Sequence, residues 1–312
     1  MKDRKLPWTS EVVSRLRRVG LGEFLFVLLI LTLLIVTFRG VQLKRMIANR
    51  PRAAHFATRV IGRKMDVHAR VPGAEVLAQS YAGRIIVSEK HKFIFCPVPK
   101  VANSNWKYLI RKIEGAKDYM DLTLAHDQDT SGLRYLSDYS PEEVEYLLYK
   151  SGYHKFVFVR DPYTRLLSAY MDKLVNKYES KEEYRIWLGK LYDWKHVRES
   201  DFINDARPSF QAFVDELLKQ DPDRMNEHWM PQAYVCGFGE VPYDFVGRFE
   251  NIERDASRVL QKIGAQDEDF PSQEQIGFAA TGSSQLVDEF YTLDIMLKAR
   301  ILYDVDFTIL GY

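Results

Sequence analysis

The stretch Lys92-Phe-Ile-Phe-Cys-Pro-Val-Pro-Lys-Val-Ala-Asn-Ser-Asn-Trp106 decides the fold that we expect for this chain. Its opening residues, 92–96, form an apolar run of the kind that is typical of a buried strand. Beyond the polar loop, apolar residues recur at helical spacing, at Trp106, Leu109, Ile110 and Ile113. Loop N–H groups and the positive end of the helix dipole then point at one spot, where Lys100 adds a full charge. The stretch therefore predicts an anion-binding loop between a strand and a helix.

This loop occupies the place of the phosphate-binding loop of nucleoside-triphosphatases, but it lacks the sequence G-x-x-x-x-G-K-[ST] that marks those proteins. A nucleoside-triphosphate kinase or ATPase would also need a metal-holding aspartate after a strand, and the sequence shows no clear candidate. The pattern therefore favours a different phosphorylated ligand.

A second polar loop follows another buried run, residues 154–159. Arg160 leaves the end of that strand, and Ser168 lies two turns into a helix that begins at Pro162, where no N–H is needed. A guanidinium and a hydroxyl so placed can share one phosphate, whereas a surface Arg160–Asp161 pair is the alternative interpretation. Joined to the first loop, the motif predicts two anion sites at neighbouring strand ends. Such a pair suits a nucleotide phosphorylated at both its 5′ and 3′ positions.

Further patterns extend the α/β alternation. Residues 84–88 predict a short strand, residues 243–249 a strand followed by a helix that stops at Gly264, and residues 288–304 a C-terminal helix. Alternating strands and helices predict a mostly parallel sheet covered on both faces, with ligands beyond the carboxyl ends of its strands. The segment 176–235 is helical, charged and rich in aromatic residues, so we interpret it as an insertion on the substrate side. Its aromatic side chains could stack on sugar rings or belong to the core.

Charge is distributed unevenly along the chain. Residues 1–83 carry 15 Lys and Arg against 5 Asp and Glu, a net charge of +10, whereas the remaining 29 Lys and Arg face 38 Asp and Glu, a net of −9. Nucleic-acid binding by the acidic body is disfavoured, because it normally needs a basic footprint.

The basic leader contains a membrane signal. Residues 19–38 are mostly apolar and carry Glu23 as their only charge, and twenty residues at helical rise cover about 30 Å, the thickness of a bilayer core. A cleavable signal peptide is the alternative, but no A-x-A-like site follows the run. We therefore expect an uncleaved transmembrane anchor at 19–38, a tail at 1–18, a basic stem at 39–83 and a folded domain at 84–312.

The chain has two cysteines, Cys96 and Cys236, which are too few for a disulfide scaffold and lack zinc-type spacing. They could pair in an oxidising compartment, or both could be small buried hydrophobic residues. The sequence also shows no carboxylate pair with metal-ligand spacing, so no metal is expected.

With these motifs in place, residues 84–312 resemble the Golgi carbohydrate sulfotransferases, in particular the branch that acts on chondroitin and dermatan. The stretches Asn226-Glu-His-Trp229 and Tyr243-Asp-Phe-Val-Gly247 also match that branch, as does Glu250. The chain departs from it at Gly237-Phe-Gly-Glu-Val241, where further cysteines are usual, and at Ala279-Ala-Thr-Gly-Ser-Ser284, where a basic residue is usual.

The resemblance implies a P-loop-like sheet that binds 3′-phosphoadenylyl sulfate (PAPS). Its 5′-phosphosulfate would lie on the first loop, at Pro99, Lys100, Val101, Ala102, Asn103, Ser104 and Asn105. Its 3′-phosphate would lie on Arg160 and Ser168. The resemblance further implies a single-pass type II Golgi membrane protein with a luminal catalytic domain and a glycan acceptor.

Sulfuryl transfer needs a cation at the oxygen that leaves with the nucleotide, for which Lys100 is the candidate. A base must take the acceptor's proton, and His126, between the two loops, is the first candidate, with His228 and Glu227 as rivals. His228, Trp229 and Lys173 are the expected substrate contacts.

The identity of the acceptor sugar is the least determined of these expectations. Transfer to the 4-hydroxyl of N-acetylgalactosamine is the first expectation, and uronyl 2-O or glucuronyl 3-O transfer are alternatives. The alternative that is not an enzyme is a membrane-anchored glycan-binding protein without catalytic activity. The sequence leaves the oligomeric state open.

Overall fold

The centre of the fold is a five-stranded sheet with the strand order β3-β1-β2-β4-β5. It is seen in a computed structural model, which describes residues 70–175, 181–192, 207–277 and 281–312. The strands are β1 (Ile86–Ser88), β2 (Phe93–Cys96), β3 (Arg134–Tyr135), β4 (His154–Val159) and β5 (Phe245–Arg248). Four of them fall within the runs that the sequence predicted. β3 was not predicted, because two residues are too few to show a period.

The sheet is mixed, and this corrects the expectation of a mostly parallel one. β2, β4 and β5 run parallel, with Cys96 opposite Val157 and Val159 opposite Arg248. β1 pairs antiparallel with both β2 and β3. Only residues 89–92 connect β1 to β2, which is far too short for the crossover that parallel strands require. The parallel part is nevertheless the part that carries both predicted loops.

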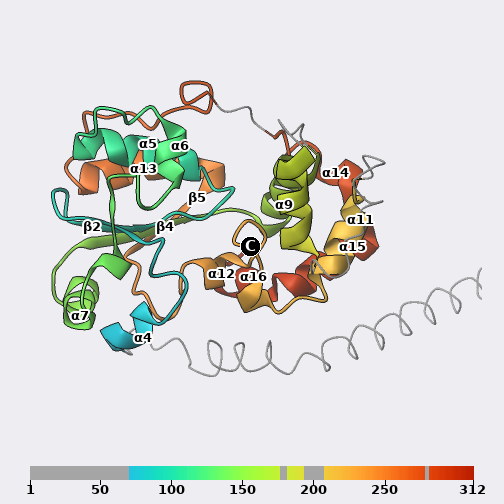
Figure 1. Ribbon diagram of the computed structural model, residues 1–312, viewed down its shortest axis with the longest axis horizontal. Coiled ribbons are helices and arrows are strands. Elements are labelled where there is room, and N and C mark those ends of the chain that lie inside the picture. Colours follow the sequence, from blue (N-terminus) through green and yellow to red (C-terminus); the bar gives the residue numbers. More distant parts are fainter. Residues whose placement is uncertain (1–69, 176–180, 193–206, 278–280) are drawn as a thin grey trace, which may run out of the picture. The chain divides into compact units, whose positions relative to one another are not determined.

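Helices cover both faces of the sheet (Figure 1). On one face lie α5 (Asn103–Glu114), α6 (Leu122–His126) and α13 (Ile252–Lys262), and on the other lie α4 (Gly73–Leu77) and α7 (Pro141–Tyr149). The predicted helices after β2 and β5 are confirmed, and α13 ends just before Gly264, whose φ is +73°. α7, which was not predicted, begins with a capping box formed by Ser140 and Glu143.

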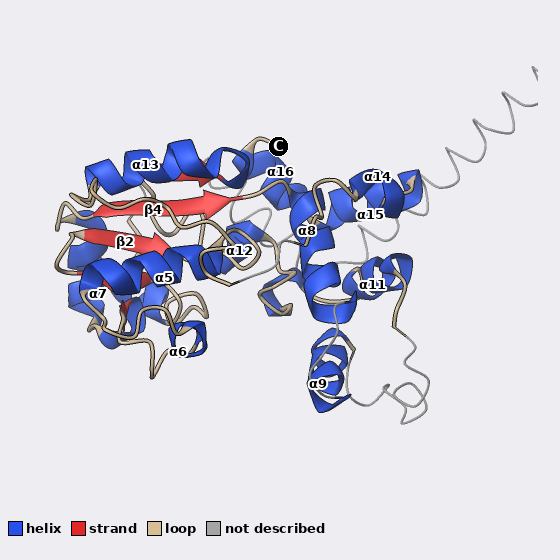
Figure 2. Cartoon of the chain, turned by 90° about the horizontal axis from the view of Figure 1, so that it is seen from above, coloured by secondary structure: helices blue, strands red, loops and turns tan. Residues whose placement is uncertain are grey.

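A second group of helices lies beyond the carboxyl ends of β2 and β4 (Figure 2). It comprises α8 (Pro162–Tyr170), the π-helical turn η2 (Met171–Val175), α9 (Lys181–Leu191), α11 (Phe210–Leu217), α12 (Gln232–Val235), α14 (Val287–Phe290), α15 (Leu293–Leu302) and α16 (Asp304–Leu310). The single C-terminal helix predicted at 288–304 is therefore wrong. The chain leaves the helix after Phe290, and Thr292 caps a new one by accepting a hydrogen bond from the N–H of Ile295.

Aromatic packing beneath the first loop holds α5 against the sheet. Trp106 is fully buried, with its ring centroid 5.2 Å from that of Phe95 and 5.0 Å from that of Phe158. Gly247 on β5 permits this packing, because a Cβ there would lie 2.3 Å from the Phe158 ring. In the segment 176–235, Tyr184 and Trp187 are buried, so these two aromatic residues belong to the core.

The predicted tail, the anchor at 19–38 and nearly all of the stem lie outside the described residues. Across the ranges that the structure does describe, no helix combines the length and the apolar character that a membrane crossing needs. All of these ranges fall within one compact unit, Phe56–Tyr312.

Candidate functional site

The first loop joins the end of β2 to the start of α5 and leaves the helix N-terminus free of side-chain caps. Lys100 and Ala102 both adopt left-handed backbone conformations, with φ of +68° and +52°, which non-glycine residues rarely occupy. The N-cap residue Ala102 offers no side-chain acceptor to the first-turn N–H groups. An uncapped first turn leaves donors for an anion, as the sequence predicted.

The ammonium of Lys100 is turned toward a carboxylate. Its Nζ lies 3.0 Å from Oδ2 of Asp172, and the same oxygen lies 3.1 Å from Nζ of Lys173. Burial lowers the pKa of Lys100, while Asp172 opposes that shift. Asp172 was not among the predicted site residues. It follows α8 in η2, so its position depends on how that helix packs above the loop.

The guanidinium of Arg160 is surrounded by neutral oxygens. Nη1 donates to the carbonyl of Lys100 at 3.1 Å, so the second loop touches the first directly. Nε donates to Oγ1 of Thr164 at 3.1 Å, and Nη2 donates to the hydroxyls of Ser283 at 2.9 Å and Ser284 at 3.2 Å. Burial lowers the pKa of Arg160 to about 10, so the group stays charged at neutral pH.

Ser168 joins this cluster through residues 281–284. Its hydroxyl lies 3.1 Å from that of Thr281, which in turn lies 3.3 Å from that of Ser283. The structure therefore brings Arg160 and Ser168 together, linked through the hydroxyl groups of Ser283 and Thr281 and not by a direct hydrogen bond. At the place where the resemblance leads one to expect a basic residue, this chain has hydroxyl groups.

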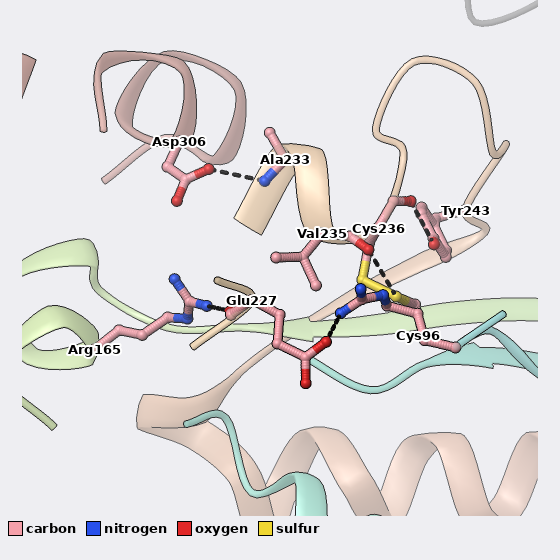
Figure 3. Close-up of a disulfide and its surroundings, with 9 residues drawn as sticks. Cys96, Arg165, Glu227, Ala233, Val235, Cys236, Tyr243 and Asp306 are labelled. Carbon is pink, nitrogen blue, oxygen red and sulfur yellow. Dashed lines mark hydrogen bonds and ion pairs between the residues drawn. A yellow bond between two sulfur atoms is a disulfide. The ribbon is translucent and has the colours of Figure 1, made fainter. Parts of the chain in front are cut away.

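Two further side chains fix the second loop and were missed by sequence reasoning. The Gln232 amide accepts from the N–H of Arg160 at 2.9 Å and donates to its carbonyl at 2.8 Å. Asp306 on α16 accepts from the N–H of Gln232 at 2.8 Å and from the N–H of Ala233 at 2.8 Å, the second of which is drawn in Figure 3. Because all of these groups are buried, the position of Arg160 is set by a satisfied polar network.

Arg165 links the first loop to the segment that contains Glu227. It is fully buried, and it donates to the carbonyls of Pro99 at 3.0 Å and Met230 at 2.7 Å. It also donates to the carbonyl of Glu227 at 2.9 Å (Figure 3). The sequence signal was an arginine in the interior of the predicted helix after the second loop. The sequence does not show the structural role of Arg165, because the three carbonyls that accept its hydrogen bonds come from distant segments of the chain.

Cys96 and Cys236 form a disulfide with a Cα–Cα distance of 5.9 Å (Figure 3). Of the two alternatives that the sequence left open, the structure shows the pairing. Cys96 ends β2 and Cys236 follows α12, so the bond connects the base of the first loop to the element that carries Gln232.

His126 lies beside the first loop, as predicted, with Nε2 3.0 Å from the hydroxyl of Ser104. Although the residue as a whole is exposed, burial of its ring, followed by repulsion from Lys107 and Lys173, lowers its pKa to about 4. The imidazole is therefore neutral at pH 7 and can accept a proton. His91 and His154 lie at the opposite, amino-terminal ends of β2 and β4.

The predicted substrate contacts divide into two kinds. Trp229 is fully buried, 5.7 Å from the Phe213 ring, so its expected contact with substrate is wrong and it is a core residue. His228 is half-buried, and its Nδ1 lies 2.8 Å from Oδ1 of Asn226. Lys173 lies over the ring of Trp187 at 4.3 Å, close enough to the site to influence the pKa of His126 and of His228.

Two further groups of residues remain, the donor-loop residue Asn105 and the basic residues that follow the second loop. Asn105 donates its side-chain N–H to the carbonyl of Pro271 at 2.8 Å, so its amide nitrogen is used within the protein. Basic residues recur about every four positions after the second loop, at Lys173, Lys177, Lys181 and Arg185. Lys177 and the Lys181 side chain lie outside what the structure describes, and Arg185 lies 3.8 Å from Glu182, as expected of a solvated helix face.

A pocket of about 300 Å³ opens between the first loop, α6 and the segment before β1. It is lined by Ser80, Gly83, Arg84, Pro97, Pro99, Asn103, Lys107, His126, Gln128, Tyr135 and Glu227. Within it, Nη1 of Arg84 lies 2.5 Å from Oε2 of Glu227. His126 and Glu227, two of the three candidate bases, thus share one cavity next to the donor loop.

Comparison with known proteins agrees with this geometry. Residues 83–312 match the sulfotransferase family. The chain belongs to that family. It is 35% identical over 231 residues to carbohydrate sulfotransferase 14 of Danio rerio, an alignment that covers 73% of this chain and 62% of the relative. It is 41% identical over 181 residues to carbohydrate sulfotransferase 14 of Homo sapiens, covering 58% of this chain and 46% of the relative.

A third relative, carbohydrate sulfotransferase 11 of Danio rerio, is 32% identical over 205 residues, covering 63% of this chain and 58% of the relative. The chain thus spans about half to three-fifths of the length of these curated relatives. No solved structure matches this chain significantly. The family match covers both loops, the network behind Arg160 and every residue that lines the pocket except Ser80.

Proposed function

We propose that this chain is a PAPS-dependent carbohydrate O-sulfotransferase. The observation that carries the proposal is the contact between the two loops, in which Nη1 of Arg160 donates to the carbonyl of Lys100. Two anion-binding loops joined in this way suit one ligand with charged groups at both ends. PAPS, with a 5′-phosphosulfate and a 3′-phosphate, is such a ligand.

In the proposed reaction, an acceptor hydroxyl oxygen forms a bond to sulfur while the bond from sulfur to the nucleotide oxygen breaks. Negative charge grows on that nucleotide oxygen, and the Lys100 ammonium stabilises it. The acceptor proton passes to His126. The products are a sulfate ester and adenosine 3′,5′-bisphosphate (PAP), and positioning with charge stabilisation supplies most of the rate, as in phosphoryl transfer.

Support for His126 as the base comes from its place in the pocket. His126 lines the cavity beside the donor loop, whereas His228 is not among the lining residues. Glu227 also lines it, but its carboxylate is held by Arg84. The His126 imidazole lies beside the loop and is neutral at pH 7, so it has an unprotonated nitrogen that can take the acceptor proton.

The finer expectations rest on the resemblance and the leader sequence. We propose chondroitin- or dermatan-like glycans as acceptors, with N-acetylgalactosamine 4-O transfer leading. We also propose a type II Golgi membrane protein, with residues 1–18 cytoplasmic, 19–38 in the membrane and 84–312 luminal. Disaccharide analysis of glycans from cells with and without this protein tests the acceptor.

The function itself is tested by two measurements on the purified protein. A single-turnover assay with labelled PAPS and a mixed glycan acceptor should yield labelled glycan. Calorimetric titration should show PAP binding without magnesium and no comparable binding of ATP. Preference for ATP with magnesium would instead support a kinase, and glycan binding with no transfer would support a non-catalytic lectin-like protein.

A further inference from the structure

Lys107 is a nearly buried lysine on the wall of the pocket. The residue lies on α5, one turn beyond Asn103, and it is 8% exposed. Among the residues that the structure describes, none forms an ion pair or hydrogen bond with its Nζ. Burying an unpaired charge is costly, so such groups are rare unless something pairs with them. Lining a cavity, Lys107 is accessible to a ligand.

The neighbouring charges do not neutralise Lys107. Glu227, the one carboxylate among the residues that line the pocket, is held by Arg84 through Nη1. His126 is neutral at pH 7, so Arg84, Lys107 and Glu227 together give the pocket lining a net positive charge. That net charge fits one monoanionic group, with Lys107 as the cation that no described carboxylate pairs with directly.

Two residues that line the same cavity each also have one buried polar atom without a partner in the described part of the chain. These atoms are Nε of Arg84, a donor, and Oδ1 of Asn103, an acceptor. Buried polar atoms normally have partners, so a donor and an acceptor left open here indicate a ligand that offers both. A sugar with hydroxyl groups and an acidic group does so. The cavity volume lies at the lower end of the range for small-ligand sites, about 300–1,000 Å³.

We propose that Lys107, assisted by Nε of Arg84, binds an anionic group of the acceptor glycan and so sets the specificity of the reaction for acidic glycans. This inference rests on the proposed function and assigns the acceptor side of the same site. The anionic group is a carboxylate or a sulfate ester on the sugar chain, each of which carries one negative charge. His126 lines the same cavity, so the bound group also lies near the base.

A second consequence concerns the base itself. Lys107 is the first of the two lysines whose repulsion, after burial, depresses the pKa of His126. An anion bound to Lys107 offsets that repulsion, so the acceptor raises the proton affinity of His126 as it binds. A neutral acceptor would lack this effect.

The experiment uses Lys107→Met, which keeps the apolar stem but removes the charge, and Lys107→Arg, which restores a charge. Binding of chondroitin tetrasaccharides is measured by calorimetry, and transfer is measured with the same acceptors. We expect Lys107→Met to weaken acceptor binding and raise the acceptor KM by about 10- to 100-fold, the worth of one charge-assisted hydrogen bond. PAP binding should be unchanged, and Lys107→Arg should recover most of the loss.

Lys117→Met is the matched control, because Lys117 is exposed just beyond the end of α5 and removal of its charge should change none of these values. Each protein is tested with an intact, a carboxyl-reduced and a desulfated acceptor. If the Lys107→Met defect disappears with the carboxyl-reduced acceptor, the group is a carboxylate, and if it disappears with the desulfated one, the group is a sulfate ester.

A defect of equal size with all three acceptors, or no defect at all, overturns the inference. Acceptor binding is a readout separate from transfer. If the wild-type protein binds the tetrasaccharide through Lys107 but transfers no sulfate and ignores PAP, then the proposed function fails while the subsite stands.

Discussion

The two anion-binding loops hold their cations in different ways. Lys100 in the first loop is ion-paired with Asp172, whose carboxylate it shares with Lys173. Arg160 in the second loop is held by hydroxyl and carbonyl oxygens, and no carboxylate among the described residues pairs with it. One loop thus pairs its cation directly with a carboxylate, whereas the other binds its cation through neutral oxygens and has the Glu250 and Asp161 carboxylates nearby without a direct ion pair.

This difference indicates that the two loops have different roles in binding and in catalysis. An arginine fixed by neutral oxygens presents a constant charge, which suits a group that stays bound throughout, such as a 3′-phosphate. A lysine that can exchange one carboxylate for another anion suits the place where charge appears only during the reaction. The first loop should therefore control the rate of transfer and the second loop the affinity for the nucleotide.

Lys100→Met gives the largest effect expected from this comparison. Losing the cation at the departing oxygen should lower kcat by about a thousandfold, the upper range for one preorganised donor. Single-turnover transfer from labelled PAPS measures it. The control is Lys92→Met, because Lys92 lies just before the amino-terminal end of β2 and also has a left-handed backbone, with φ of +54°.

Activity of Lys100→Met within a few-fold of wild type would remove Lys100 from the mechanism. A defect confined to PAPS affinity, with kcat preserved, would break the comparison, since both loops would then serve binding alone. Thermal melting of both variants shows whether the fold is intact.

His126→Ala should lower kcat by about a hundredfold, the lower end for general-base catalysis, with little change in the affinity for PAPS. His126 contacts Ser104 at the start of α5, so it belongs with the first loop in the comparison. His228→Ala and Glu227→Gln are made in parallel. If His126→Ala turns over normally while one of the other two does not, the role of base passes to that residue.

Arg160→Lys should weaken PAP binding by about thirtyfold, because a lysine keeps the charge but loses the paired donors. Adenosine 5′-phosphate, which lacks the 3′-phosphate, is the matched ligand, and its affinity should hardly change. Calorimetry with both nucleotides gives the two values. Equal losses for both ligands would show that Arg160 acts on the first loop through the Lys100 carbonyl and not on the 3′-phosphate.

The sequence predicted both loops and their position at neighbouring strand ends because short sequence patterns indicate each of them. The buried runs at 92–96 and 154–159 show their strands, and the polar residues that follow show where ligands bind. The antiparallel half of the sheet escaped prediction because β3 has two residues and β1 is joined to β2 by a turn. The break between α14 and α15 escaped because the apolar pattern continues through Thr292.

The supporting residues of the site were hidden for a different reason. Asp172, Gln232 and Asp306 look in sequence like ordinary polar residues of helices, and their function depends on contacts across tens of residues. Lys107 lies between Trp106 and Leu109, where a lysine on a helix normally indicates a solvated face. Only tertiary packing shows that this lysine is nearly buried and lines a pocket.

The smallest predicted effect uses pH to distinguish Lys107 in the pocket from Arg160 in the second loop. Burial lowers the pKa of Lys107 to about 8, with Glu227 and Asp127 opposing the shift and Arg84 adding to it. The charged form binds the acidic acceptor, so acceptor affinity should fall as pH rises above about 8, by at most about tenfold per unit for one proton. Arg160, with a pKa of about 10, keeps its charge over this range.

Calorimetry between pH 7.5 and 9.5 tests this, because the 3′-phosphate is fully ionised there. The ratio of PAP affinity to adenosine 5′-phosphate affinity isolates the second loop, and it should stay constant while acceptor affinity declines. In Lys107→Arg the guanidinium remains charged, so the decline should vanish. If acceptor affinity still declines with pH in Lys107→Arg, another group causes the pH effect. If the ratio of PAP affinity to adenosine 5′-phosphate affinity falls in parallel, Arg160 and Lys107 do not differ in their response to pH.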